Sequence, residues 1–113
     1  MSRVEALRQI AANNPGVVAF FAEPIQGEGG VNPLSVNYLQ AVRQICDEQQ
    51  WLLMLDEIQS GLCRTGRWYD HHHEGIRPDV LTSAKALANG LPIGACMASG
   101  RAASSMKPGM HGS

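Results

Sequence analysis

The chain of 113 residues is long enough for one domain with one apolar core, and too short for the two-domain architecture of most cofactor-dependent enzymes. Hydrophobic residues make up 44% and charged residues 17%, a globular composition that argues against a disordered or collagen-like chain. Nine Lys and Arg stand against ten Asp and Glu, so nucleic-acid binding is not expected. No apolar run approaches the roughly 18 residues of a membrane span, and no signal peptide is recognised. Three widely spaced cysteines fit a reducing compartment, so we expect a soluble, cytoplasmic protein without membrane contact.

The first elements are predicted from capping and periodicity. Ser2 and Glu5 have capping-box spacing, and apolar residues then recur at helical intervals until Asn14, Pro15 and Gly16 end the helix. Six apolar residues follow without alternation at 17–22, which predicts a strand buried on both faces. The sheet is therefore expected to be parallel.

The later elements continue the alternation. A second helix is predicted to begin near Ser35 and to end near Gln50. Further short strands are expected at 51–55, 80–81 and 93–98. Strands that alternate with helices or long connections indicate an α/β domain with a mostly parallel sheet and helices on both faces.

Ligands of open α/β sheets bind beyond the carboxyl ends of the strands, where this chain places two acids and an amine. Glu23 and Asp56 end two predicted strands, and Lys85 follows a third. Lysine is usually a surface residue and aspartate often a turn or cap residue, but arginine outnumbers lysine seven to two here. An amine that must lose its proton and attack a carbonyl cannot be replaced by arginine. A Schiff-base lysine and an acid that pairs with a pyridinium nitrogen are what pyridoxal phosphate requires.

Four segments, in order and spacing, resemble the class III pyridoxal-phosphate-dependent aminotransferases. They read EPIQGEGG at 23–30, LDEIQSG at 55–61, RTG at 64–66 and PDVLTSAKAL at 78–87. The resemblance extends from about Val17 to Ser113, and it implies the fold type I, aspartate aminotransferase-like large domain.

The resemblance also implies roles for individual residues. Lys85 resembles the catalytic lysine that forms a Schiff base with pyridoxal 5'-phosphate and then moves a proton between substrate and cofactor. Asp56 is similar to the acid that keeps the pyridine nitrogen protonated, Gln59 to the donor to the phenolic oxygen, and Ile58 to the apolar side chain against the ring. Glu28 resembles the substrate-site acid that, in ornithine-type members, pairs with a distant arginine.

The subgroup implied is the acetylornithine and ornithine aminotransferases, which residues 66–68 and 107–113 resemble most. In these proteins the last segment leads into a hydroxyl residue that binds the phosphate of the neighbouring subunit's cofactor, and Ser113 is identified with it. The implied reaction transfers an amino group from acetylornithine, or a similar ω-amino donor, to 2-oxoglutarate. Ornithine, 4-aminobutyrate and other ω-amino-acid aminotransferases remain alternatives.

The domain prediction is a partial cofactor-binding large domain over residues 1–113, without the family's N-terminal phosphate loop and C-terminal small domain. The full-length parent is expected to be a homodimer that binds an amino acid and a 2-oxo acid, and the chain alone is expected to be inactive. The alternative is a non-catalytic fragment or gene remnant of such an enzyme. The run of histidines at 71–73 is interpreted as a solvated turn rather than a metal site, because consecutive side chains point in different directions.

Overall fold

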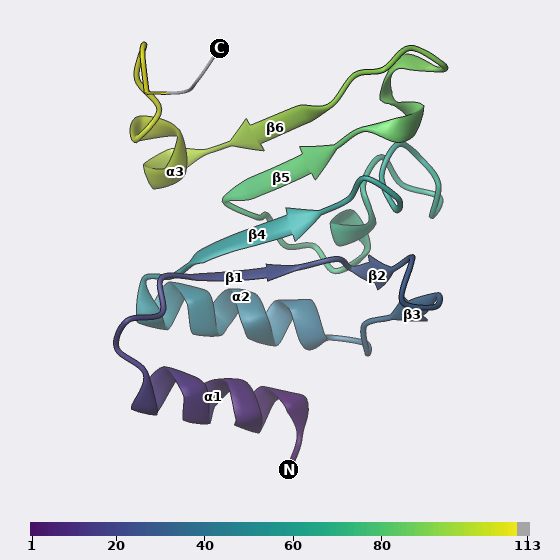
Figure 1. Cartoon of the computed structure of the whole chain (residues 1–113). Helices are drawn as coiled ribbons and strands as arrows, with labels where there is room; N and C mark the ends of the chain where they lie inside the picture. The colour runs from purple at the N-terminus through teal and green to yellow at the C-terminus, as the bar shows by residue number, and fades with distance from the viewer. Residues whose placement is uncertain (111–113) are drawn as a thin grey trace.

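The computed structural model describes residues 1–110 and contains a four-stranded sheet with helices packed beside it (Figure 1). The sheet order is β1 (Ala19–Ala22), β4 (Leu52–Asp56), β5 (Val80–Ser83) and β6 (Ala95–Ala98). The first three strands are parallel, and β6 is antiparallel to β5. The mostly parallel sheet predicted from the sequence is confirmed.

Helix α1 (Arg3–Asn13) begins where the capping box predicts. The Ser2 hydroxyl accepts the backbone N–H of Glu5 at 3.2 Å, and the Glu5 carboxylate accepts the N–H of Ser2 at 2.6 Å. Helix α2 (Tyr38–Gln49) begins later than predicted, after a left-handed Asn37 whose side chain makes no capping hydrogen bond. Neither helix, nor any other within residues 1–110, is long and apolar enough to cross a lipid bilayer.

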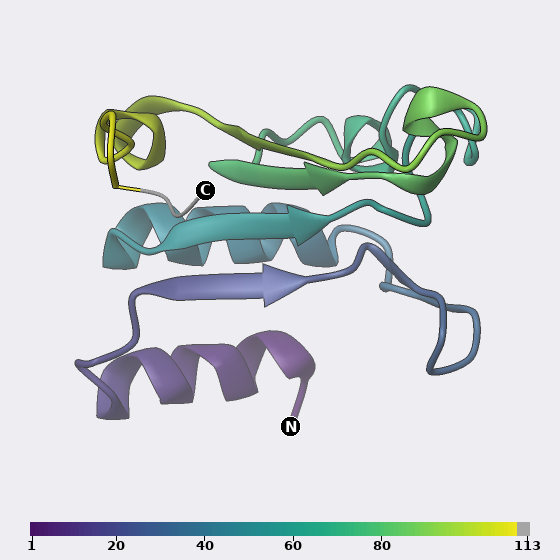
Figure 2. The ribbon, with the colours of Figure 1, turned by 45° about the horizontal axis from the view of Figure 1, so that its top comes forward.

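The core lies between the sheet and the two helices. Strand β4 alternates: Leu53 and Leu55 are buried, and the other three residues of the strand are partly exposed, as the two-residue period of a strand requires. The buried core cluster consists of Leu7, Leu39, Val42, Ile45, Cys46, Trp51, Leu53, Leu55 and Leu81. One face of the sheet therefore carries the core, with α2 packed against β4 and α1 packed against α2 near the β1 edge (Figure 2).

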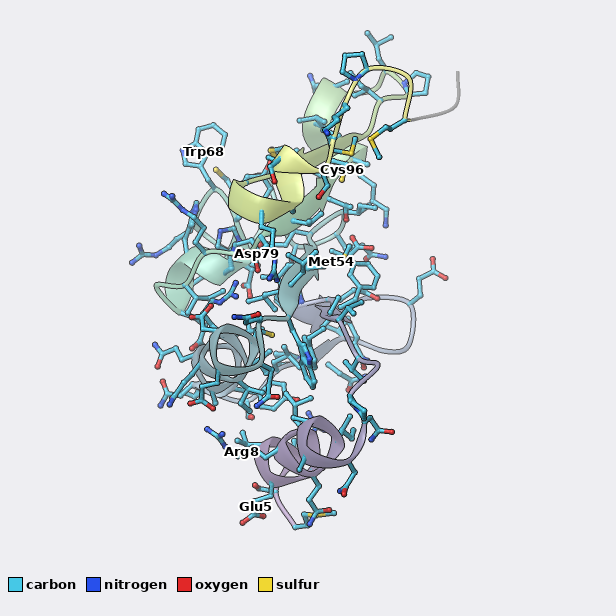
Figure 3. The ribbon with its side chains drawn as sticks, turned by 90° about the vertical axis from the view of Figure 1, so that its left-hand side faces the viewer. Glu5, Arg8, Met54, Trp68, Asp79 and Cys96 are labelled. Atoms are coloured by element: carbon cyan, nitrogen blue, oxygen red, sulfur yellow. The ribbon has the colours of Figure 1, made fainter. Side chains whose placement is uncertain are left out.

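The strand order explains why α2, in the connection from β1 to β4, and η1 (Asp70–His73), in the connection from β4 to β5, lie on the same side of the sheet. The connections from β1 to β4 and from β4 to β5 advance in the same direction, and right-handed crossovers that do so lie on the same side of the sheet. The sequence predicts helices on both faces of the sheet, and α1 and α2 cover one of these faces. Met54, labelled in Figure 3, lies on the side of β4 away from α2. Phe21 is 60% exposed, so within the described residues β1 is not buried on both faces as its unbroken apolar run predicts.

Several short elements were not predicted. They are the hairpin strands β2 (Ile25–Gln26) and β3 (Asn32–Pro33), the 3-10 helices η1 (Asp70–His73) and η2 (Lys85–Ala88), and helix α3 (Gly100–Ser104). Elements of two to five residues give too few positions for a hydrophobic period to be recognised. The β2–β3 hairpin, η1 and η2 bear directly on the candidate site.

Candidate active site

The carboxyl ends of β1, β4 and β5 meet at one edge of the sheet, and the segments that follow them gather there (Figure 1). The β2–β3 hairpin follows β1, the turn at 57–66 follows β4, and η2 follows β5. A cavity of about 410 Å³ lies between these three segments. Its lining includes Gly27, Ile58, Gln59, Thr65, Lys85 and Ala86.

Lys85 is the only lysine among the residues that line this cavity. It is the first residue of η2, directly beyond β5, and its side chain is exposed rather than packed in the core. Its backbone is left-handed, with a φ of 51°, a conformation that costs a residue with a side chain roughly 1 kcal/mol or more. The turn thus holds the amine at the cavity in a conformation that a free chain rarely adopts.

Gln59 and Ile58 line the same cavity, and Gly27 brings the neighbouring loop against them. A Cβ added at Gly27 would overlap the Gln59 amide, with Nε2 only 2.7 Å away. The loop after β1 can therefore touch the turn after β4 because Gly27 has no side chain. The Glu23 carboxylate accepts the backbone N–H of Gly27 at 3.1 Å and fixes this approach.

Asp56 ends β4 and lies beside the cavity rather than in its lining. Its Oδ1 atom accepts the backbone N–H of Ile58 at 3.0 Å, which shapes the turn that carries Ile58 and Gln59. Because Asp56 has the same strand phase as Met54, its side chain is on the sheet face opposite the core. Glu28 is exposed on the hairpin loop and does not line the cavity, and Ser113 lies outside the described residues.

A buried carboxylate next to Asp56 was not anticipated from the sequence. Glu57 is 1% exposed and accepts hydrogen bonds from the backbone N–H of Asp70, the Ser60 hydroxyl and the backbone N–H of His71. His71 Nδ1 lies 2.5 Å from Glu57 Oε2 and carries a hydrogen there, because a carboxylate only accepts. Burial alone would raise the pKa of Glu57, but these hydrogen bonds outweigh it and lower the pKa below its ordinary value of 4.5.

The histidine run is not the solvated turn predicted from the sequence, because it lies in η1 and its first member is buried. His71 is buried against Glu57, and His73 Nε2 donates to the Thr65 carbonyl oxygen at 3.0 Å, at the edge of the cavity. Across residues 1–110, no three His, Cys, Asp or Glu side chains are grouped as metal ligands. Trp68, by contrast, projects from this segment and is 67% exposed (Figure 3). No signal in the sequence marks Glu57, because residues 51–55 are apolar throughout and the buried phase of Leu53 and Leu55 is visible only in the structure.

The donor set at this edge fits pyridoxal phosphate. An amine, an amide and an apolar side chain, from Lys85, Gln59 and Ile58, line one cavity, and the Asp56 carboxylate ends the strand beside it. These are the groups needed to bond an aldehyde, to donate to a ring oxygen, to pack on a ring and to pair with a protonated ring nitrogen.

Comparison with known proteins assigns relatives to the whole chain. The family model of aminotransferase class-III matches residues 1–113. The acetylornithine aminotransferase of Nitrosomonas europaea is 54% identical over 110 residues, which are 97% of this chain and 28% of that protein. The chain thus spans about a quarter of the length of the curated relatives it matches.

Solved structures agree with the sheet described above. An ornithine aminotransferase from Toxoplasma gondii, whose active site holds pyridoxal phosphate at partial occupancy, matches 97% of this chain and 26% of its own, with a TM-score of 0.90 and 46% identity. Acetylornithine aminotransferase from Elizabethkingia anophelis matches 97% of this chain and 28% of its own, with a TM-score of 0.90 and 38% identity. The likeness confirms the fold type I prediction.

Proposed function

Because the chain belongs to the class-III aminotransferases, we propose that it forms part of the cofactor-binding large domain of an enzyme that transfers amino groups with pyridoxal phosphate. The proposed reaction moves an amino group from acetylornithine, or a similar ω-amino donor, to 2-oxoglutarate. The observation that carries the proposal is that Lys85 and Gln59, on separate strand ends, line one cavity. The cofactor bound by the Toxoplasma gondii relative supports the choice of pyridoxal phosphate.

The proposed chemistry assigns one task to each side chain. Pyridoxal phosphate, when bound, supplies an aldehyde that reacts with amines and a ring that accepts an electron pair. Lys85 would hold the cofactor through its aldehyde carbon, and once a substrate amine had displaced it, the free Nζ would carry a proton between the substrate carbon and that cofactor carbon. Asp56 pairs with the protonated ring nitrogen, Gln59 donates to the ring oxygen, and Ile58 packs on the ring and excludes water.

Two further assignments rest on the resemblance alone. We assign Glu28, on the exposed hairpin loop, to the substrate site, and Ser113 to the cofactor phosphate of a neighbouring subunit. The proposed assembly is a homodimer that binds an amino acid and a 2-oxo acid. The unpaired state of the cysteines at 46, 63 and 96 supports a reducing, cytoplasmic location.

The test uses the protein expressed from the complete reading frame that encodes this chain. Borohydride reduction in the presence of pyridoxal phosphate should leave the cofactor's mass on the peptide that contains Lys85. The Lys85→Ala variant should lose both this adduct and the visible absorbance of the bound cofactor. Lys107→Ala removes the other lysine of the chain, an exposed one, and should keep both. Adduct formation that persists in Lys85→Ala contradicts the assignment.

The amino donor is tested separately, because the relatives above include both acetylornithine and ornithine aminotransferases. We expect kcat/KM with 2-oxoglutarate as acceptor to be highest for acetylornithine, ahead of ornithine and 4-aminobutyrate. A preference for ornithine or 4-aminobutyrate would support the proposed aminotransferase activity but contradict acetylornithine as the amino donor. A protein that binds the cofactor on Lys85 but transfers no amino group would support a non-catalytic relative.

A further inference from the structure

Two neighbouring hydroxyl groups on β5 are buried without a hydrogen-bond partner in the part of the chain that the structure describes. They are Thr82 Oγ1 and Ser83 Oγ. An unpartnered buried hydroxyl is a cost that folded proteins rarely keep, so each such group requires a physical explanation. The two groups differ in the face of the sheet that they occupy.

Thr82 lies beside Asp56. The two residues are register partners in the parallel pairing of β4 with β5, so their side chains are on the same face of the sheet. Cys96, labelled in Figure 3, is the register partner of Thr82 on the other side, in β6. Ser83 has the opposite phase and is 1% exposed on the core side of the sheet, the side of Leu55.

Asp56 has an unused capacity to accept. Its Oδ1 atom takes the backbone N–H of Ile58, and no second donor to this carboxylate is formed within residues 1–110. A carboxylate can accept about four hydrogen bonds. The chain thus places a hydroxyl donor that lacks an acceptor next to a carboxylate that lacks donors, at the strand ends that bear the candidate site.

We infer that Thr82 is a positioning residue whose hydroxyl donates a hydrogen bond to the Asp56 carboxylate when that carboxylate pairs with the cofactor's ring nitrogen. The inference rests on the proposed function. Rotation about the Cα–Cβ bond of Thr82 brings the hydroxyl into a different staggered position, and no backbone movement is needed. The bond holds the carboxylate in one orientation and favours its charged form, which is the form that pairs with a protonated nitrogen.

The test measures cofactor affinity and apo-protein stability in four variants of the protein from its complete reading frame. Thr82→Val keeps the shape and removes the hydroxyl, and it should weaken equilibrium binding of pyridoxal phosphate about tenfold. The pH dependence of the bound cofactor's visible absorbance should shift in the same variant. Its melting temperature without cofactor should stay equal or rise, because an unpartnered hydroxyl has been removed.

The remaining variants separate this role from packing. Thr82→Ser should bind the cofactor at least several-fold more tightly than Thr82→Ala. These two variants differ by one oxygen, so their comparison tests the hydroxyl even if Thr82→Val fails to fold. Ser83→Ala removes the matched hydroxyl on the other face and should leave cofactor affinity unchanged. Equal affinity and an equal absorbance profile in the Ser and Ala variants at position 82 would overturn the inference. A wild-type protein that does not bind the cofactor at all would instead overturn the proposed function.

Discussion

The buried carboxylate of Glu57 gives a quantitative prediction for stability. Glu57→Gln keeps the shape of the side chain and one acceptor oxygen, but it turns an amide NH₂ toward the two donors of His71 that now bond Oε2. The imidazole can change tautomer, whereas the backbone N–H of His71 loses its acceptor in a buried position. One lost charge-assisted bond and one orphaned donor should lower the free energy of unfolding by roughly 2 to 3 kcal/mol.

The measurement is urea unfolding at neutral pH of the protein from its complete reading frame, wild type against variant. Glu48→Gln is the matched control, because Glu48 also loses a hydrogen-bonded carboxylate but pairs with Arg8 on the surface. Exposed ion pairs contribute little, so the midpoint of this control should stay at the wild-type value. If the two variants unfold at the same urea concentration, the reasoning from burial is wrong.

The pKa of Glu57 sets the pH dependence of this effect. Because folding lowers the pKa below 4.5, the folded state binds fewer protons here than the unfolded state. The contribution of Glu57 is therefore fully present above pH 4.5 and is lost as pH falls through the lower folded value. The difference between wild type and Glu57→Gln should narrow in acid. A difference that stays constant below pH 4.5 would refute the assignment of the stabilising charge to Glu57.

Two further predictions concern the loop beside the cavity and the hydrophobic core. Gly27→Ala places a Cβ where the Gln59 amide lies, so we expect weaker binding of pyridoxal phosphate by equilibrium titration with little change in thermal stability, since only the end of a flexible side chain must move. Gly29→Ala in the same loop meets nothing within 4 Å and should bind as the wild type does. Burial raises the pKa of the Cys46 thiol to about 11, so this thiol should not react with iodoacetamide in the native protein, whereas exposed Cys63 should. Mass spectrometry should find Cys46 modified only after the protein is unfolded.

Local signals in the sequence were sufficient for some elements and not for others. The capping box at Ser2 fixes the start of α1, because both of its hydrogen bonds join residues three apart. The start of α2 depends on a left-handed residue at Asn37, which has no comparable signature. The left-handed backbone of Lys85 likewise has no local signature, so a pattern that places the lysine after a strand does not predict the turn that presents it.

The same limit explains why only one of two adjacent acids was assigned. The apolar run at 51–55 contains no alternation, so the sequence does not say which face Asp56 and Glu57 occupy. The structure resolves this through burial, since Leu53 and Leu55 face the core. The Asp56 side chain is therefore on the opposite face of the sheet. The Glu57 side chain is on the core face, where it accepts a hydrogen bond from η1. The resemblance predicts a role for Asp56, whereas the burial of Glu57 follows only from its tertiary contacts.

The acids at these strand ends share a physical role that precedes any chemistry. Glu23, Asp56 and Glu57 each accept backbone N–H groups of the segments that form or support the cavity. A carboxylate satisfies donors that a tight turn cannot pair internally, so the loop after β1 and the turn after β4 are held by bonds within the chain. Gly27 and Gln59 therefore line the cavity on segments that hydrogen bonds within the chain already hold, and the cost of ordering these two segments is met in folding rather than in binding.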